Sequence, residues 1–275
     1  MSNIESGATL RDSASVEPVG TGHYAVALSE DFTVLGRPHG GYLQCVLASA
    51  ALAAASEAGS SHLHAVALST NFAGGCEPGL AQLHTAIRRL GRGASFVHVT
   101  LSQHGGVAVE SLVTLATLHD EPARYSDAVA PLVAPLDQCV RWSGPDQLNI
   151  TRALDLRLDP ASDGWSTGQL STRGEVLAWM RLGDGNSTWD PWSMLFASDA
   201  LPPATFPLGS SGWVPTLQLT TYARRIPVGE WLRARQWCVV IAGDMVDERC
   251  ELFDERGELV GSSSQLAMVR FPKER

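Results

Sequence analysis

The sequence predicts an α+β protein built from two tandem modules, each an antiparallel sheet wrapped around one helix. Three observations support this prediction. A helix that begins after residue 36 is apolar or small on nearly every face, long alternating strands follow it, and the same order of elements returns in the second half of the chain. We expect modules at 20–119 and 150–272, joined by a linker at 120–149.

The helix of the first module lies in the segment 36–55, which reads GRPHGGYLQCVLASAALAAA. A helix without a polar face is buried in protein or spans a membrane. This one is shorter than the about 20 apolar residues that a membrane span needs, so we expect no span. The turn at 39–41 allows close approach to the backbone and leaves free N–H groups at the start of the helix. We therefore place the helix inside the sheet formed by the strands that follow.

The strands of the first module are predicted from alternating hydrophobicity. Residues 1–20 are polar, and we expect them to be frayed. A short strand at 23–28 precedes the helix, and long strands follow it at 62–72, 80–90, 94–103 and 107–118. The turn at 104–106 predicts a hairpin between the last two.

The linker and the second module follow the same logic. Segment 120–149 contains four prolines and no clean period, which indicates a surface linker. A second helix is predicted at 190–201, with Asp190 as the N-cap, Pro191 at the first helical position and Pro202 after its end. The strands of this module are expected at 153–158, 170–182, 214–226, 231–242, 245–254 and 258–270.

Composition excludes several classes of function. The net charge is −9 with a sequence pI near 5.3, and no basic stripe is present, so we expect no nucleic-acid partner. The five cysteines form no CxxC motif, and the first residues do not resemble a signal peptide, which together favour a cytoplasmic protein. His62 and His64 form an HxH pair without a third ligand at suitable spacing, so we expect no metal site.

Four short segments, in this order of elements, resemble the type II acyl-CoA thioesterases, whose fold is a double hotdog. Segment 38–41 resembles the family's Phe-Gly-Gly turn, with His39 before the glycines where the family has an aromatic residue. Segment 196–199 resembles the small-Ser-Asp step of the second helix. Segment 215–217 resembles a family segment that contains the catalytic threonine. Segment 260–265 resembles one that ends in the catalytic glutamine.

The resemblance implies that Asp199, Thr216 and Gln265 are catalytic and hydrolyse acyl-CoA without a metal or an organic cofactor. Asp199 is expected to act as the general base or to orient a water molecule. The hydroxyl of Thr216 is expected to hold that water. The amide of Gln265 is expected to donate to the water or to the thioester carbonyl, because a glutamine that points into a core needs partners.

Substrate binding is expected at the start of the first helix, at His39, Gly40, Gly41 and Tyr42. Backbone N–H groups at a helix N-terminus stabilise an anionic oxygen, so the two glycines are candidates for that role.

Two other hypotheses keep the fold and change the function. One is a non-catalytic module that binds acyl-CoA. The other is a hydratase or dehydratase, enzymes that resemble one another in an Asp/His pair near the first helix. His39 has no aspartate near it in the sequence, which counts against this hypothesis. We also expect a homodimer, because the edge strands of a sheet invite pairing.

Overall fold

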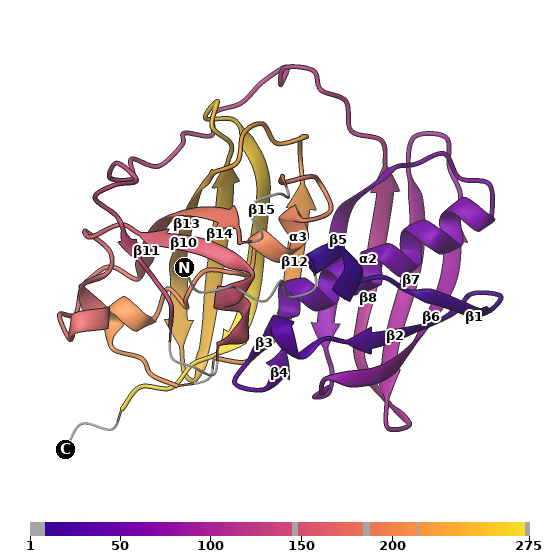
Figure 1. Cartoon of the computed structure of the whole chain (residues 1–275), viewed down its shortest axis with the longest axis horizontal. Coiled ribbons are helices and arrows are strands. Elements are labelled where there is room, and N and C mark those ends of the chain that lie inside the picture. Colours follow the sequence, from indigo (N-terminus) through magenta and orange to yellow (C-terminus); the bar gives the residue numbers. More distant parts are fainter. Residues whose placement is uncertain (1–8, 145–147, 184–187, 213, 273–275) are drawn as a thin grey trace, which may run out of the picture.

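One 13-stranded sheet dominates the computed structural model, which describes residues 9–144, 148–183, 188–212 and 214–272. The strand order is β1-β2-β6-β7-β8-β5-β12-β15-β14-β13-β11-β10-β9, and all neighbours are antiparallel (Figure 1). The first half of the sheet comprises β1 (Glu17–Gly20), β2 (His23–Leu28), β5 (His64–Phe72), β6 (Gly79–Arg89), β7 (Ser95–Gln103) and β8 (Gly106–Ala116). The second half comprises β9 (Val140–Arg141), β10 (Leu154–Leu158), β11 (Glu175–Leu182), β12 (Thr216–Ala223), β13 (Leu232–Ala242), β14 (Met245–Phe253) and β15 (Leu259–Met268). A separate pair, β3 (Thr33–Val34) and β4 (Arg37–Pro38), leads into the first long helix.

The two predicted sheets are in fact continuous. Strands β5 and β12 pair in the middle of the molecule, with Thr70 opposite Leu219 and Leu68 opposite Thr221. Each strand would otherwise expose a row of unpaired N–H and C=O groups at the edge of its own half. The prediction of two sheets is therefore wrong in this respect, although each half keeps its own strands.

The predicted buried helix is α2 (Gly40–Glu57). It packs against β5, β6, β7 and β8 and against the second helix, α3 (Met194–Ala197). Twelve of its residues are buried, a set that includes the fully enclosed side chains of Val46, Leu47 and Ala50. The absence of a polar face predicts a buried helix, and the burial of α2 confirms this prediction. In the described part of the chain, no helix has both the length and the apolar character to cross a membrane.

The second helix is much shorter than the predicted span 190–201. Asp190 closes a turn instead, because its Oδ1 accepts from the N–H of Ser193 at 2.7 Å, and the α-helix covers only Met194–Ala197. The chain leaves the helix through i→i−3 bonds, from the N–H of Asp199 to Phe196 and from that of Ala200 to Ala197. The next two carbonyls have no helical donor because residues 202 and 203 are prolines, so tertiary partners satisfy them. Ser263 donates to the carbonyl of Ser198 at 2.8 Å, and His39 contacts the carbonyl of Asp199 at 2.8 Å. Asp199 consequently lies just beyond the helix rather than within it.

The N-terminal segment is ordered from residue 9, which contradicts its predicted fraying. It forms α1 (Leu10–Ser13) and then β1, which pairs with β2. Ala14 is fully buried, and the hydroxyl of Tyr42 donates to the carbonyl of Ser13 at 2.6 Å. Buried apolar contacts of this kind hold a terminus that sequence polarity alone would release. Residues 1–8 lie outside the described part.

The segment between the halves runs over the surface, as its prolines predict. Residues 117–139 contain neither helix nor strand, and their trace arches from one half to the other (Figure 1). Ala134 anchors the segment to the second half: its N–H donates to Asp159 at 2.7 Å, and its carbonyl accepts from the indole of Trp179 at 2.9 Å. β11 begins at Glu175, five residues later than predicted.

Candidate active site

The site is built where the N-terminus of α2 meets the end of α3, and Gly41 makes that contact possible. A Cβ at this position would lie 2.8 Å from the carbonyl oxygen of Leu195 and 2.9 Å from that of Phe196. Real Cβ atoms do not approach backbone oxygens so closely. Only glycine lets the two helices touch, which explains why the sequence has a small residue at the head of a helix.

Asp199 lies across this contact from the start of α2. Its Oδ2 accepts a hydrogen bond from the backbone N–H of Gly41 at 2.8 Å. Its Oδ1 makes no hydrogen bond to any residue that the structure describes, and 11% of the side chain is exposed. Burial raises the pKa of Asp199, while the facing His39 ring and the Gly41 N–H act in the opposite direction. A carboxylate with a raised pKa and one unpaired oxygen has the properties of a general base.

His39 caps α2 and holds Asp199 in place. Its Nδ1 accepts from the backbone N–H of Tyr42 at 3.4 Å, so the proton of the neutral ring lies on Nε2. Nε2 then donates to the carbonyl of Asp199 at 2.8 Å, with the carboxylate Oδ2 at 3.3 Å. Both ring nitrogens are thus engaged. His39 therefore orients Asp199.

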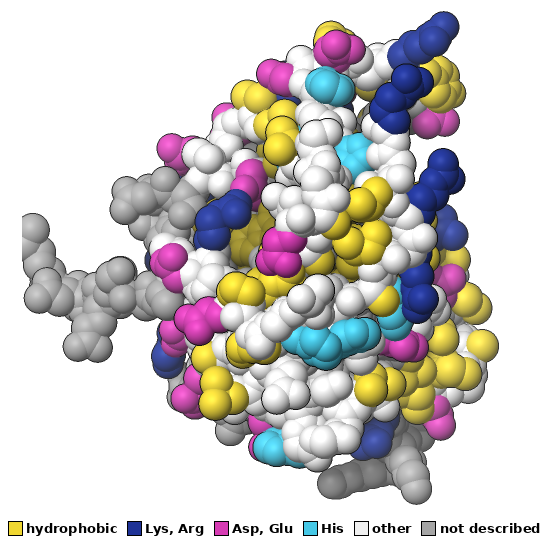
Figure 2. All heavy atoms as spheres, turned by 90° about the vertical axis from the view of Figure 1, so that its right-hand side faces the viewer, with side chains coloured by type: hydrophobic (Ala, Val, Ile, Leu, Met, Phe, Trp, Pro, Cys, Tyr) yellow, Lys and Arg dark blue, Asp and Glu magenta, His cyan; other side chains and the backbone are white. Residues whose placement is uncertain are grey.

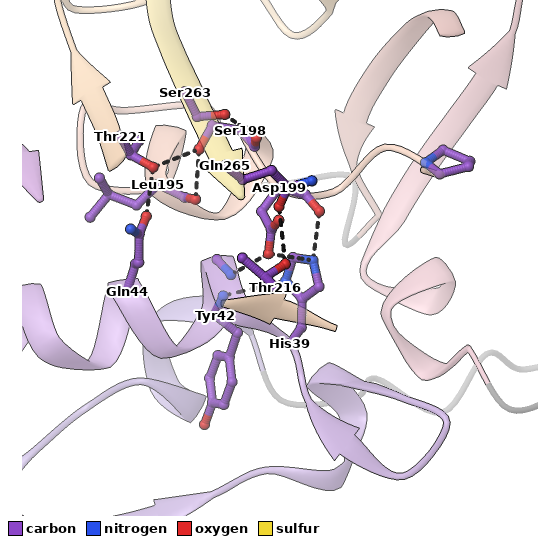
Figure 3. Close-up of polar contacts among 12 residues, drawn as sticks. His39, Tyr42, Gln44, Leu195, Ser198, Asp199, Thr216, Thr221, Ser263 and Gln265 are labelled. Atoms are coloured by element: carbon purple, nitrogen blue, oxygen red, sulfur yellow. Dashed lines mark hydrogen bonds and ion pairs between the residues drawn. The ribbon is translucent and has the colours of Figure 1, made fainter. Parts of the chain in front are cut away.

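Thr216 and Gln265 form a second group beside the first (Figure 3). Thr216 begins β12 at a bulge, where the register against β15 shifts between residues 216 and 218. Bulges of this kind redirect side chains near functional sites. The hydroxyl of Thr216 donates to Oε1 of Gln265 at 3.0 Å. No hydrogen bond within the described residues joins this pair directly to Asp199, so a bridging water is required for the three to act together.

Sequence reasoning missed Glu248, which lies opposite Gln265 on β14. Its side chain is buried, with 1% exposed, and its Oε2 accepts from Nε2 of Gln265 at 2.5 Å. Burial raises the pKa of Glu248 to about 7, and the charge of Asp199 adds to this rise, whereas the hydrogen bond from Gln265 opposes it. The signal was present in the sequence: Glu248 occupies an inward position of a strand whose other inward residues are Val246, Cys250 and Leu252.

A buried polar chain ties the site to the centre of the sheet. Gln44 on α2 accepts from Thr221 at 2.7 Å and donates to Thr70 at 3.0 Å. Thr221 in turn contacts the hydroxyl of Ser198 at 3.3 Å, and Ser263 donates to the carbonyl of Ser198. Because Ser198 precedes Asp199, this chain positions the end of α3 relative to α2, β5, β12 and β15 (Figure 3).

The remaining predicted residues have different outcomes. The N–H of Gly41 is occupied by Asp199, which contradicts its predicted role as an oxyanion donor. The N–H of Gly40 makes no hydrogen bond with the described residues, and a Cβ there would lie 2.7 Å from Oδ2 of Asp199. The side chain of Tyr42 points away from the cluster (Figure 3). Its hydroxyl is bonded to Ser13 and Ser29, and burial raises its pKa to about 12.

Among the residues with described positions, no three His, Cys, Asp or Glu side chains are grouped in a way that could hold a metal ion.

Comparisons with solved structures define the class of this protein as the hotdog fold. A hotdog-fold protein of unknown function from Alicyclobacillus acidocaldarius matches with a TM-score of 0.82 and 19% identity, over 96% of this chain and 98% of the other. A protein assigned as a thioesterase II from Thermobifida fusca YX matches with a TM-score of 0.86 and 33% identity, over 95% and 97% of the two chains.

Sequence comparisons then identify the family. Residues 28–117 match the model of the acyl-CoA thioesterase N-terminal domain, and residues 127–269 match that of the C-terminal domain. An uncharacterised protein from Mycobacterium tuberculosis is 31% identical over 273 residues, which cover 88% of this chain and 89% of the relative. The chain therefore belongs to the acyl-CoA thioesterase family.

Proposed function

We propose that this protein is an acyl-CoA thioesterase made of two hotdog modules, and that it releases free acid and CoA by direct attack of water. The arrangement of Asp199 supports the proposal most directly. One carboxylate oxygen is held by the Gly41 N–H, and the other has no hydrogen-bonding partner among the described residues. The side chain of Thr216 lies next to Asp199 (Figure 3). A carboxylate held in this way can accept a proton without moving.

In the proposed reaction, a water molecule donates one hydrogen to Oδ1 of Asp199 and the other to Oγ1 of Thr216. Its lone pair attacks the thioester carbonyl carbon, and one proton passes to Asp199. The N–H of Gly40, at the positive end of α2, stabilises the resulting oxyanion. The tetrahedral intermediate expels the CoA thiolate, which takes the proton from Asp199, so that acid and thiol are the products.

Asp199→Asn tests this mechanism. The amide keeps the shape of the side chain and cannot accept the proton, so kcat should fall by roughly 10²- to 10⁴-fold. A panel of acyl-CoAs of increasing chain length, with a thiol-reactive dye as the readout, identifies the best substrate first. Asp244→Asn, in the exposed turn after β13, is the matched control. Wild-type rates in the Asp199 variant would refute the mechanism, and absence of thiol release by the wild type would favour the binding module.

A hydratase or dehydratase is the second candidate, because the structure supplies the Asp/His pair that sequence distance hides. Nε2 of His39 lies 3.3 Å from Oδ2 of Asp199, although 160 residues separate the two in the chain. Such enzymes need a ring nitrogen that is free to take a proton from the substrate, and both nitrogens of His39 are engaged. The geometry therefore favours hydrolysis. An assay for water addition to a 2-enoyl-CoA separates the two: hydration without thiol release would reverse the assignment.

We further propose a cytoplasmic homodimer. The continuous sheet leaves β1 and β9 as its edges, and all four residues of β1 are exposed. The face of the first half mixes apolar side chains with histidines and polar groups (Figure 2). Light scattering should give about twice the monomer mass of 29.3 kDa. A monomer mass would contradict the proposal.

A further inference from the structure

Glu248 is a buried carboxylate that the proposed mechanism leaves unexplained. Only 1% of it is exposed, and no ion pair within the described residues involves it. Its side-chain partners are the amide of Gln265 at 2.5 Å, the amide of Gln236 at 3.4 Å and the thiol of Cys238 at 3.9 Å. Backbone N–H groups of Ala204 and Thr205 also face it and lower its pKa. A buried carboxylate without a cationic partner destabilises the fold, which suggests that it is kept for another reason.

The carboxylate decides which way the amide of Gln265 faces. An ionised carboxylate only accepts hydrogen bonds, so Nε2 of Gln265 must point at Glu248 and Oε1 must point at Thr216. The opposite orientation would place two acceptor oxygens in contact. Oε1 therefore receives the single hydroxyl hydrogen of Thr216, at 3.0 Å. With its hydrogen committed, Oγ1 of Thr216 can only accept from a third group.

We propose that Glu248 is a positioning residue, which sets the direction of the hydrogen-bond chain from Thr216 through Gln265 and thereby makes Thr216 an acceptor for the attacking water. This inference rests on the proposed function. A water that donates to both Asp199 and Thr216 keeps its lone pair free for the thioester carbon. If Glu248 is protonated, it can donate to Gln265 and reverse the chain. The amide then donates to Thr216, and the freed hydroxyl hydrogen competes for the lone pair of the water.

The direction of the chain therefore depends on the charge of Glu248. The titratable groups that face it are Asp199 beyond α3, Cys238 on β13 and Cys250 on its own strand. Burial raises the pKa of both thiols, to about 12 for Cys238, so they stay neutral near pH 7. Asp199 contributes its negative charge and raises the pKa of Glu248 further. Activity should consequently rise with pH as Glu248 ionises.

A double-mutant cycle with Glu248→Gln and Thr216→Val tests the proposal, measured on the best acyl-CoA. Glu248→Gln should lower kcat by about 10- to 100-fold, as expected for a misplaced catalytic group, while KM changes by less than about 2-fold. It should also remove the ionisation of Glu248 from the pH profile of kcat. In the Thr216→Val background the same change should have no further effect, because the chain is already broken. Glu251→Gln, on the outer face of the same strand, is the matched control and should behave as wild type.

Three outcomes would overturn the inference: an unchanged kcat, an unchanged pH profile, or effects of the two substitutions that multiply. Measuring Asp199→Asn in parallel separates this inference from the proposed function. If Asp199→Asn is inactive and Glu248→Gln is normal, only the role of Glu248 fails. If no acyl-CoA is hydrolysed, NMR still tests the chain. The side-chain amide of Gln265 should shift with pH in the wild type, and an amide that does not titrate refutes the proposal.

Discussion

The buried charge of Glu248 has a consequence for stability that can be measured without any substrate. Its pKa is raised by burial from 4.5 to about 7 in the folded protein. A carboxyl with a raised folded pKa favours folding in its protonated form. The free energy of unfolding should therefore fall as pH rises from the unfolded value through the folded value. Replacing Glu248 with glutamine removes this dependence.

The magnitude follows from the size of the shift. The difference between about 7 and 4.5 is about 2.5 units, and one unit corresponds to about 1.4 kcal/mol, so the total is roughly 3 kcal/mol. Most of this change falls between about pH 5 and about pH 8. Relative to the wild type, Glu248→Gln should thus gain roughly 2 to 3 kcal/mol across that range. Groups that do not interact with Glu248 contribute to both proteins and cancel in the difference.

Urea denaturation followed by tryptophan fluorescence is a suitable assay. With a slope of about 1–3 kcal/mol per molar, the variant's midpoint should rise by about 1 M or more relative to wild type between the two pH values. Glu251→Gln should track the wild type. A constant difference between Glu248→Gln and wild type across pH would refute the reasoning, because it would mean that Glu248 binds protons equally in the folded and the unfolded protein and that its pKa is not raised.

Two further predictions concern the packing around the site. Gly41→Ala should destabilise the protein by about 1–3 kcal/mol and lower activity, because the added Cβ collides with the carbonyl of Leu195. Gly93→Ala, where the added Cβ meets open space, should change neither stability nor activity. Equal melting temperatures for the two variants would contradict this prediction. Gln44→Leu removes the amide oxygen that accepts from the hydroxyl of Thr221, and it should lower the free energy of unfolding in urea by about 2–4 kcal/mol. Gln82→Leu, at an exposed position, should cause no measurable change. A Gln44 variant as stable as the wild type would show that the buried polar chain is dispensable.

The long elements were predictable because their physics is local. The buried helix α2 and most strands of both halves follow from hydrophobic periodicity, and their observed limits differ from the predicted ones by a few residues. The helix predicted at 190–201 is wrong in length: it covers only Met194–Ala197, and His39 and Ser263 from distant segments satisfy the carbonyls that follow it. The prediction for the N-terminal segment is also wrong. Its polarity predicts fraying, but the hydrogen bond from the hydroxyl of Tyr42 and the burial of Ala14 hold it in place.

For the candidate site, too, the sequence determined some features and the tertiary structure determined others. By itself, the sequence determined the alternating strands, the enclosed helix and, through family resemblance, the identities of Asp199, Thr216 and Gln265 as candidates. Only the tertiary structure decided that Asp199 meets His39 and that Gln265 faces Glu248. Periodicity reports which face of an element avoids water, so it says nothing about which distant side chains that face will meet. The partners of a buried polar group depend on how strands pair and helices pack, and those contacts exist only once the chain has folded.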